Sequence, residues 1–159
     1  MLFQKKESVL LAVANGRAIE LAEVPDDAFA SGMLGVGFAI IPSDGTVYAP
    51  ASGCVESVSD SKHAYTIQTD DGLDLLVHIG IDTVELKGEG FLPMVTAGDR
   101  VQAGDVLARV DLNILRGGNF PTVIPVLISN SDAVFIKKTR IGNMIGGEDA
   151  VLDYRLVKK

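Results

Sequence analysis

Glycine and proline interrupt this chain so often that no long helix can form. Seventeen Gly and six Pro are spread over the 159 residues rather than clustered. They divide the sequence into short apolar segments, each of strand length and bounded by turn-forming residues. This pattern favours an all-β sandwich or barrel, with helices limited to short connecting turns.

Seven segments are predicted to be strands, because each is rich in apolar residues and ends near Gly, Pro, Asn or Asp. Two further segments, residues 25–30 and 112–116, are predicted to form only a helical turn or two. The predicted strands are residues 9–14, 38–41, 54–58, 64–69, 73–78, 106–111 and 123–128.

Length and composition indicate one folded domain. Hydrophobic residues make up 47% of the chain and charged residues 22%, which supplies enough apolar material for a core. We expect residues 1–8 to form a short N-terminal tail and residues 9–159 to form a single domain. The longest apolar runs have six residues, far fewer than the roughly 20 that span a bilayer, so no transmembrane helix is expected.

The charge balance and the cysteine count limit the partners and the compartment. With 14 Lys and Arg against 21 Asp and Glu, the net charge is −7. This charge disfavours nucleic acid and anionic membranes as partners and favours a basic protein surface. The single cysteine, Cys54, cannot form an internal disulfide, and no Cys and His cluster has zinc-finger spacing. A reducing, cytosolic location fits best.

Two histidines, His63 and His78, carry most of the chemical information, because the familiar nucleotide-binding, hydrolase and metalloprotease motifs are missing from the sequence. A pair of neighbouring imidazoles is suited to carrying a phosphoryl group. One ring nitrogen attacks phosphorus and holds the group as phosphohistidine, while the other ring donates a hydrogen bond to the phosphoryl oxygens. The alternative is two unrelated histidines on the surface or in the core.

A hairpin between the fourth and fifth predicted strands would bring the two histidines together. A two-residue loop of Asp70 and Asp71 places His63 directly opposite His78, and a loop of Asp71 and Gly72 places them on a diagonal. Both registers put the imidazoles on one face, within roughly 5 to 8 Å at Cβ. A three-residue loop containing all of these loop residues would instead put them on opposite faces.

Residues 78–91 carry the most specific motif, HIGIDTVELKGEGF. This motif strongly resembles the active-site segment of the glucose-type enzyme IIA domains of the bacterial sugar phosphotransferase system. The resemblance runs in the family's order from about Val9 to the C-terminus, and it implies a β-sandwich of the duplicated hybrid motif type. The other matching segments are residues 24–26, 37–40, 49–50 with 53, 62–64, 98–101 and 125–130.

The resemblance implies roles for four residues. His78 is expected to be phosphorylated on Nε2, and His63 to be the neighbouring imidazole that stabilises the phosphoryl group. Ser61 occupies the position of a family threonine whose hydroxyl supports His63, and Asp82 matches an active-site Asp expected to hydrogen-bond locally and to orient the site. Val36 stands where the family has an acidic residue, so a carboxylate that would face a basic partner is missing.

The same resemblance implies the partners and the location. It predicts a phosphotransferase component with a phosphohistidine intermediate, which takes phosphate from the histidine-containing phosphocarrier protein and passes it to a sugar permease IIB domain. The protein is expected to be cytoplasmic, with access to the inner face of the membrane through a permease. No cofactor or metal is expected for the transfer, and zinc at the His63/His78 pair is expected only in a regulatory complex.

Three other interpretations of the sequence stay open. Biotinyl and lipoyl carriers are also turn-rich β-sandwiches, but they need a lysine at a hairpin tip, usually between methionines, and no such triplet occurs here. A zinc peptidase needs at least three ligands, for which His63, His78 and Asp82 are the candidates. A regulatory protein-binding module without phosphotransfer is the alternative that is not an enzyme.

Overall fold

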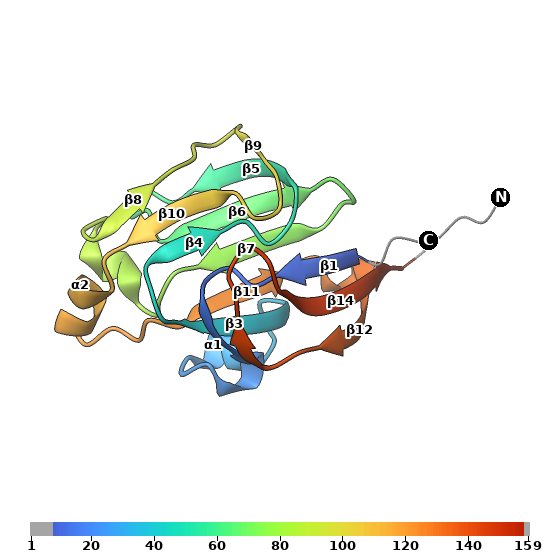
Figure 1. Cartoon of the computed structure of the whole chain (residues 1–159), viewed down its shortest axis with the longest axis horizontal. Helices are drawn as coiled ribbons and strands as arrows, with labels where there is room; N and C mark the ends of the chain where they lie inside the picture. Colours follow the sequence, from blue (N-terminus) through green and yellow to red (C-terminus); the bar gives the residue numbers. More distant parts are fainter. Residues whose placement is uncertain (1–7, 158–159) are drawn as a thin grey trace.

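Residues 8–157, which the computed structural model describes, form a sandwich of antiparallel sheets (Figure 1). An eight-stranded sheet has the strand order β13-β2-β3-β11-β7-β6-β5-β9. Two three-stranded sheets face it, with the orders β1-β14-β12 and β4-β10-β8. Within residues 8–157 these sheets do not close on themselves, so the predicted all-β fold is confirmed as a sandwich and not as a barrel.

All elements are short, as the spacing of glycine and proline predicts. The strands are β1 Ser8–Leu11, β2 Gly16–Glu20, β3 Val36–Pro42, β4 Thr46–Tyr48, β5 Gly53–Val58, β6 Ala64–Thr69, β7 Asp74–His78, β8 Phe91–Pro93, β9 Arg100–Val101, β10 Val106–Val110, β11 Ile124–Ile128, β12 Val134–Thr139, β13 Gly142–Met144 and β14 Ala150–Leu156. The α-helices are α1 Asp27–Ala30 and α2 Leu112–Gly117, and the 3₁₀ helices are η1 Leu21–Glu23, η2 Thr83–Leu86 and η3 Ser131–Ala133.

Each of the seven predicted strands overlaps an observed strand, and the two predicted helical turns are α1 and α2. The strands β2, β4, β8, β9, β12, β13 and β14 were not predicted. Among the predicted strands, residues 12–14 differ, because they leave β1 and bond to the loop before β14 and to the end of β4. Ala12 N donates to the Asp149 carbonyl oxygen at 2.8 Å, and the carbonyl oxygen of Val13 accepts from Tyr48 N at 2.7 Å. The backbone groups of residues 12–14 therefore form hydrogen bonds to residues outside the β1-β14-β12 sheet.

The main core fills the space between the sheets, and a second cluster lies on the opposite face of the large sheet. In β3, Phe38 points into the main core and the next residue, Ala39, points into the second cluster. This alternation is expected where both faces of a strand are covered. The second cluster lies against η1 and α1 and comprises Ile19, Leu21, Val24, Phe29, Ala39, Ile81, Val123 and Leu127.

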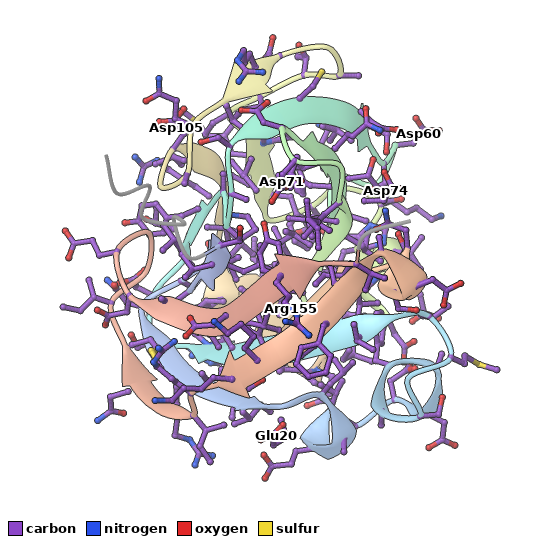
Figure 2. All side chains as sticks on the ribbon, turned by 90° about the vertical axis from the view of Figure 1, so that its right-hand side faces the viewer. Glu20, Asp60, Asp71, Asp74, Asp105 and Arg155 are labelled. Atoms are coloured by element: carbon purple, nitrogen blue, oxygen red, sulfur yellow. The ribbon has the colours of Figure 1, made fainter. Side chains whose placement is uncertain are left out.

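The loop between β6 and β7 is tied to the sheet that contains β14. Tyr154 Oη donates to Asp71 Oδ2 at 2.6 Å, and Figure 2 shows Asp71 above β14, the strand that carries Arg155. Asn130 also holds this loop, because its Nδ2 donates to the carbonyl oxygen of Gly72 at 2.9 Å. The closed end of the β6–β7 hairpin is therefore anchored to two other parts of the fold.

Two predictions remain, the N-terminal tail and the absence of a transmembrane helix. Of the predicted tail, residues 1–7 lie outside the described residues, and Ser8 is the first residue of β1. No helix among residues 8–157 has the length and apolar character needed to cross a membrane.

Candidate functional site

The β6–β7 hairpin has neither of the two expected registers. Ala64 lies opposite His78, and Thr69 N donates to the carbonyl oxygen of Leu73 at 2.9 Å, which closes a three-residue loop. Neither two-residue loop is formed; the loop is the three-residue alternative, and the expectation that it would put the two imidazoles on opposite faces is wrong. Gly72 has a φ of +99°, the left-handed conformation that three-residue hairpin loops use at their last position.

The two imidazoles nevertheless meet at the open end of the hairpin. β6 begins at Ala64, and Lys62, just before His63, has a φ of +63°. The chain therefore turns before it enters the strand, and strand alternation does not decide where the ring of His63 lies. The ring centroids of His63 and His78 are 4.8 Å apart, and the ring planes are inclined at 81°.

His78 is half-buried at the end of β7, and a backbone carbonyl fixes its ring. Nδ1 lies 2.7 Å from the carbonyl oxygen of Gly80. Because a carbonyl only accepts, Nδ1 carries the proton and the neutral ring has its free lone pair on Nε2. Gly80 has a φ of +78°, and a Cβ there would lie 2.5 Å from Thr83 Cγ2 and 3.1 Å from the Pro121 carbonyl oxygen. Only glycine fits at this position without strain.

His63 is buried, with 7% of its surface exposed, and a serine hydroxyl lies beside its ring. Ser59 Oγ is 3.3 Å from His63 Nδ1, and it also accepts the N–H of Ala64 at 3.1 Å. Ser61, the residue expected to support His63 through its hydroxyl, interacts with the ring through its backbone. The hydroxyl that reaches His63 is therefore that of Ser59, two residues earlier in the chain.

Burial lowers the pKa of both imidazoles below the ordinary value of 6.5. For His63, desolvation is the largest cause of the lower pKa, and a backbone hydrogen bond with Ser61 opposes it. For His78, desolvation is again the largest cause, the carbonyl of Gly80 opposes it, and the charge of His63 lowers the pKa further. Both rings are thus mainly neutral at pH 7, the state in which an imidazole nitrogen is a nucleophile.

Two carboxylates act on His78 through their charge, and both raise its pKa. Asp26, which the sequence did not single out as a site residue, has the larger effect and caps α1 by accepting the N–H of Ala28 at 2.9 Å. Asp82 precedes η2 with a φ of +60°. Among residues 8–157 its carboxylate forms no hydrogen bond, so its contribution to the site is its charge and not the expected local bond.

Two phenylalanines flank the imidazole pair. The ring centroid of Phe29, from α1, lies 5.1 Å from that of His78, and the centroid of Phe91, from β8, lies 6.5 Å from that of His63. Both phenylalanines are buried, so they keep water from the sides of the pair. The sequence placed Phe91 at the end of the motif and Phe29 in a connecting turn, and an apolar residue in a short connector gives no signal of a site.

The imidazole pair offers two metal ligands but not a complete metal site. Within residues 8–157 no group of three or more His, Cys, Asp or Glu side chains lies close enough to hold a metal ion. Asp82 therefore does not complete a ligand set with His63 and His78, and the zinc-peptidase interpretation is not supported. Because zinc sites in proteins usually have four ligands, a zinc ion at this pair would need ligands that these residues do not supply.

Exposed apolar side chains occur in two segments that also carry groups acting on His78, the segment of α1 with Asp26 and Phe29 and the segment of η2 with Asp82. Met33 and Leu34, which follow α1, are 78% and 42% exposed, and Val84 in η2 is 52% exposed. Val36, where the family has an acidic residue, begins β3 and packs against the main core, only partly buried. In the strand register Val36 lies level with Ile128 and Leu75, toward the start of β7, whereas His78 is the last residue of that strand.

Comparison with known proteins gives close relatives over most of the chain. A family model described as phosphoenolpyruvate-dependent sugar phosphotransferase system, EIIA 1, matches residues 8–134. The phosphotransferase system glucose-specific EIIA component of Staphylococcus aureus is 39% identical over 150 residues, which cover 94% of this chain and 90% of the relative. The corresponding component of Halalkalibacterium halodurans is 44% identical over 135 residues, which cover 84% of this chain and 78% of the relative.

A larger relative and a solved structure extend the comparison. The glucose-specific EIICBA component of Staphylococcus saprophyticus is 46% identical over 121 residues, which cover 76% of this chain but 18% of that protein. The structure of glucose permease IIA from Mycoplasma capricolum superposes with a TM-score of 0.88 over 96% of this chain and 99% of that chain, at 37% identity. This chain is thus similar to one part of the larger protein and to nearly the whole of the others.

Proposed function

The chain belongs to the EIIA 1 family of the phosphoenolpyruvate-dependent sugar phosphotransferase system, and on that premise we propose that it carries a phosphoryl group on Nε2 of His78. The observation that carries the proposal is the imidazole pair, with ring centroids 4.8 Å apart. The donor is the histidine-containing phosphocarrier protein, and the acceptor is the IIB domain of a permease. Glucose is the proposed sugar, because the relatives are glucose-specific components.

Uptake exchanges one phosphorus–nitrogen bond for another. Because Nδ1 of His78 is bound to the carbonyl of Gly80, the lone pair on Nε2 faces the incoming group. It attacks phosphorus while the P–N bond of the donor's phosphohistidine breaks, and the electron pair of that bond returns to the donor's imidazole. In onward transfer the acceptor's nucleophile attacks phosphorus, and the electron pair returns to Nε2 of His78. The buried rings of Phe29 and Phe91 beside the pair limit the access of water, which would hydrolyse the intermediate.

His63 stabilises the phosphoryl group in both steps. Its ring lies nearly perpendicular to that of His78, at 81°, so an N–H in the ring plane can donate to a phosphoryl oxygen bound to the neighbouring ring. The negative charge of the phosphoryl group raises the pKa of His63 and opposes the effect of burial. His63 therefore takes up a proton as the group arrives and gives it up as the group leaves.

The donor docks on the exposed apolar side chains around His78, with acidic side chains at the rim. Met33 and Val84 are exposed and follow closely in the chain on Asp26 and Asp82. These two carboxylates lie near enough to raise the pKa of His78. A negative rim on a chain of net charge −7 attracts a donor with basic surroundings. With Val36 in place of the family's acidic residue, the attraction is weaker at that position.

The larger relative supports a permease as the partner. In the Staphylococcus saprophyticus protein a part similar to this chain belongs to an EIICBA component. We therefore propose that residues 9–159 act as one domain in the cytoplasm and reach the membrane through a permease. The second candidate function, a regulatory protein-binding module without phosphotransfer, would use the same exposed surface but not the nucleophile.

Two variants test the proposed roles of the histidines. His78→Gln removes the nucleophile, so we expect no acid-labile phosphorylation by the phosphorylated carrier protein. His63→Gln keeps a hydrogen-bond donor but cannot take up a proton, so His78 should still accept phosphate while onward transfer to the IIB domain slows by roughly a hundred- to a thousandfold. Both steps are measured with labelled phosphate and purified partners.

The chain contains two histidines, which makes the assay unambiguous. The double variant is the control, since it has no site for phosphohistidine. If His63→Gln blocks uptake and His78→Gln does not, the nucleophile is His63. If the parent protein accepts no phosphate from the carrier, the regulatory function is selected instead.

A further inference from the structure

Tyr65 is among the largest fully buried side chains, and its hydroxyl makes a hydrogen bond that the phosphoryl chemistry leaves unexplained. Tyr65 Oη donates to the backbone carbonyl oxygen of Lys62 at 3.0 Å. Burial raises the pKa of Tyr65 far above neutrality, so the hydroxyl keeps its proton and acts as a donor. Lys62 directly precedes His63, so the bond ends on the turn that leads to the imidazole pair.

The backbone of Lys62 is strained, and both of its polar groups are bound. Its φ of +63° lies in the left-handed region, which a residue with a Cβ seldom adopts. Its N–H donates to the carbonyl oxygen of Ser59 at 2.8 Å, and its carbonyl accepts from Tyr65. Strain of this kind persists only where the surroundings fix the backbone.

The same turn, residues 59–62, determines where the ring of His63 lies. Ser59 Oγ is 3.3 Å from His63 Nδ1 and accepts the N–H of Ala64 at 3.1 Å. The carbonyl oxygen of His63 accepts from Ile79 N at 2.7 Å, which ties it to the residue after His78. A change in the turn therefore changes the position of His63 relative to His78.

We propose that the hydroxyl of Tyr65 is a positioning group that holds the turn of residues 59–62 and thereby the imidazole of His63. The proposal rests on the proposed function, because it assigns Tyr65 to the support of His63, whose loss is expected to slow the onward transfer of the phosphoryl group. Phenylalanine at this position would fill the same space in the core. It would leave the carbonyl of Lys62 without its donor.

Tyr65→Phe tests this role, and Tyr154→Phe is a matched control. In an NMR titration of the ring nitrogens, we expect the pKa of His63 in Tyr65→Phe to rise toward 6.5, because a less firmly held ring is more hydrated. Onward transfer should fall about 3- to 10-fold, the effect of one lost neutral hydrogen bond. Tyr154→Phe also removes a buried phenolic hydroxyl, but it does so at the other end of the hairpin, and it should change neither quantity.

An unchanged His63 titration together with unchanged onward transfer in Tyr65→Phe would overturn the proposal. Equal changes in Tyr154→Phe would overturn it too, because they would reflect a general loss of stability. The titration needs no phosphoryl donor and is therefore independent of the proposed function. If the parent protein accepts no phosphate but Tyr65→Phe still shifts the pKa of His63, the proposed function fails and Tyr65 still positions His63.

Discussion

The two ends of the β6–β7 hairpin are built from the same two strands but are held in different ways. At the closed end, side chains from distant parts of the chain bind the loop: Tyr154 bonds Asp71, and Asn130 bonds Gly72. At the open end, the rings of His63 and His78 are held by nearby groups within four residues of each ring.

This difference indicates that the closed end contributes to the stability of the fold, whereas the open end holds the groups that react. The bonds at the closed end join the hairpin to β14 and to the segment after β11, so they stabilise the fold as a whole. The groups at the open end fix two imidazoles in their neutral state, which prepares a nucleophile, and only the backbone there bonds to a distant segment, as Gly80 N does to the carbonyl oxygen of Val123 at 3.0 Å. Changes at the closed end should therefore affect stability alone, whereas changes at the open end should affect transfer as well.

The largest effect is expected when a methyl group is added at the open end. In Gly80→Ala the left-handed φ of +78° and the contact of the new Cβ with Thr83, at 2.5 Å, both oppose the native backbone. We expect a loss of about 2 to 5 kcal/mol in the free energy of unfolding. The carbonyl that binds His78 Nδ1 belongs to Gly80, so phosphate uptake should fall too. Chemical denaturation and the uptake assay measure the two effects.

Gly72→Ala is the matched variant at the closed end. Its φ is +99°, but no atom lies within 4 Å of an added Cβ, so only the backbone strain remains, about 1 to 2 kcal/mol. Uptake should keep its parental rate once the protein is folded. Equal losses of uptake in Gly72→Ala and Gly80→Ala would contradict the separation of the two ends.

A loss of stability similar to that of Gly72→Ala is expected from Tyr154→Phe, which removes one hydrogen bond to a carboxylate at the closed end. The bond to Asp71 has a length of 2.6 Å, and bonds to charged groups contribute about 1.5 to 3 kcal/mol. Since the carboxylate is exposed and can bind water, the loss should lie at the lower end of that range. Urea denaturation measures it, and a loss of phosphoryl transfer in the folded variant would show that the closed end affects the site.

The sequence predicted the buried, apolar strands of the fold better than its edge strands. Residues 64–69 and 123–128 are apolar enough to be recognised, and they coincide with β6 and, but for one residue, with β11. β9 has two residues, and β12 ends in the polar sequence Lys-Lys-Thr. Such segments become strands because a neighbour supplies hydrogen bonds, which is a tertiary effect that local composition does not contain.

The pairing of the imidazoles was predicted, but its structural basis was not. The two-residue loop was expected from Asp71 and Gly72 as a turn pair, whereas Thr69 closes a longer loop through its backbone and through its hydroxyl, which accepts from Leu73 N at 2.8 Å. Ser59 lies four residues from His63 in a turn with a left-handed residue. The conformation of that turn depends on contacts such as the one from Tyr65, which spacing in the sequence does not reveal.

Of these changes, mild acidification should have the smallest effect on the free energy of unfolding. Its effect should also distinguish the two ends of the hairpin. The pKa values of His63 and His78 are lowered below 6.5 in the folded protein, so the unfolded chain binds more protons as the pH falls. Stability is therefore complete above pH 6.5 and decreases as the pH falls from there toward the folded pKa values.

The lowered carboxyl pKa values of Asp70 and Asp153 act below 3.8, so the range between pH 7 and 5 reports on the imidazoles. We expect His63→Gln and His78→Gln each to flatten this dependence, measured by urea denaturation at a series of pH values, and Tyr154→Phe to shift the whole curve without changing its slope. If the slope persisted in the double histidine variant, groups other than the two imidazoles would be titrating between pH 7 and 5. The pH dependence of stability would then not come from the open end.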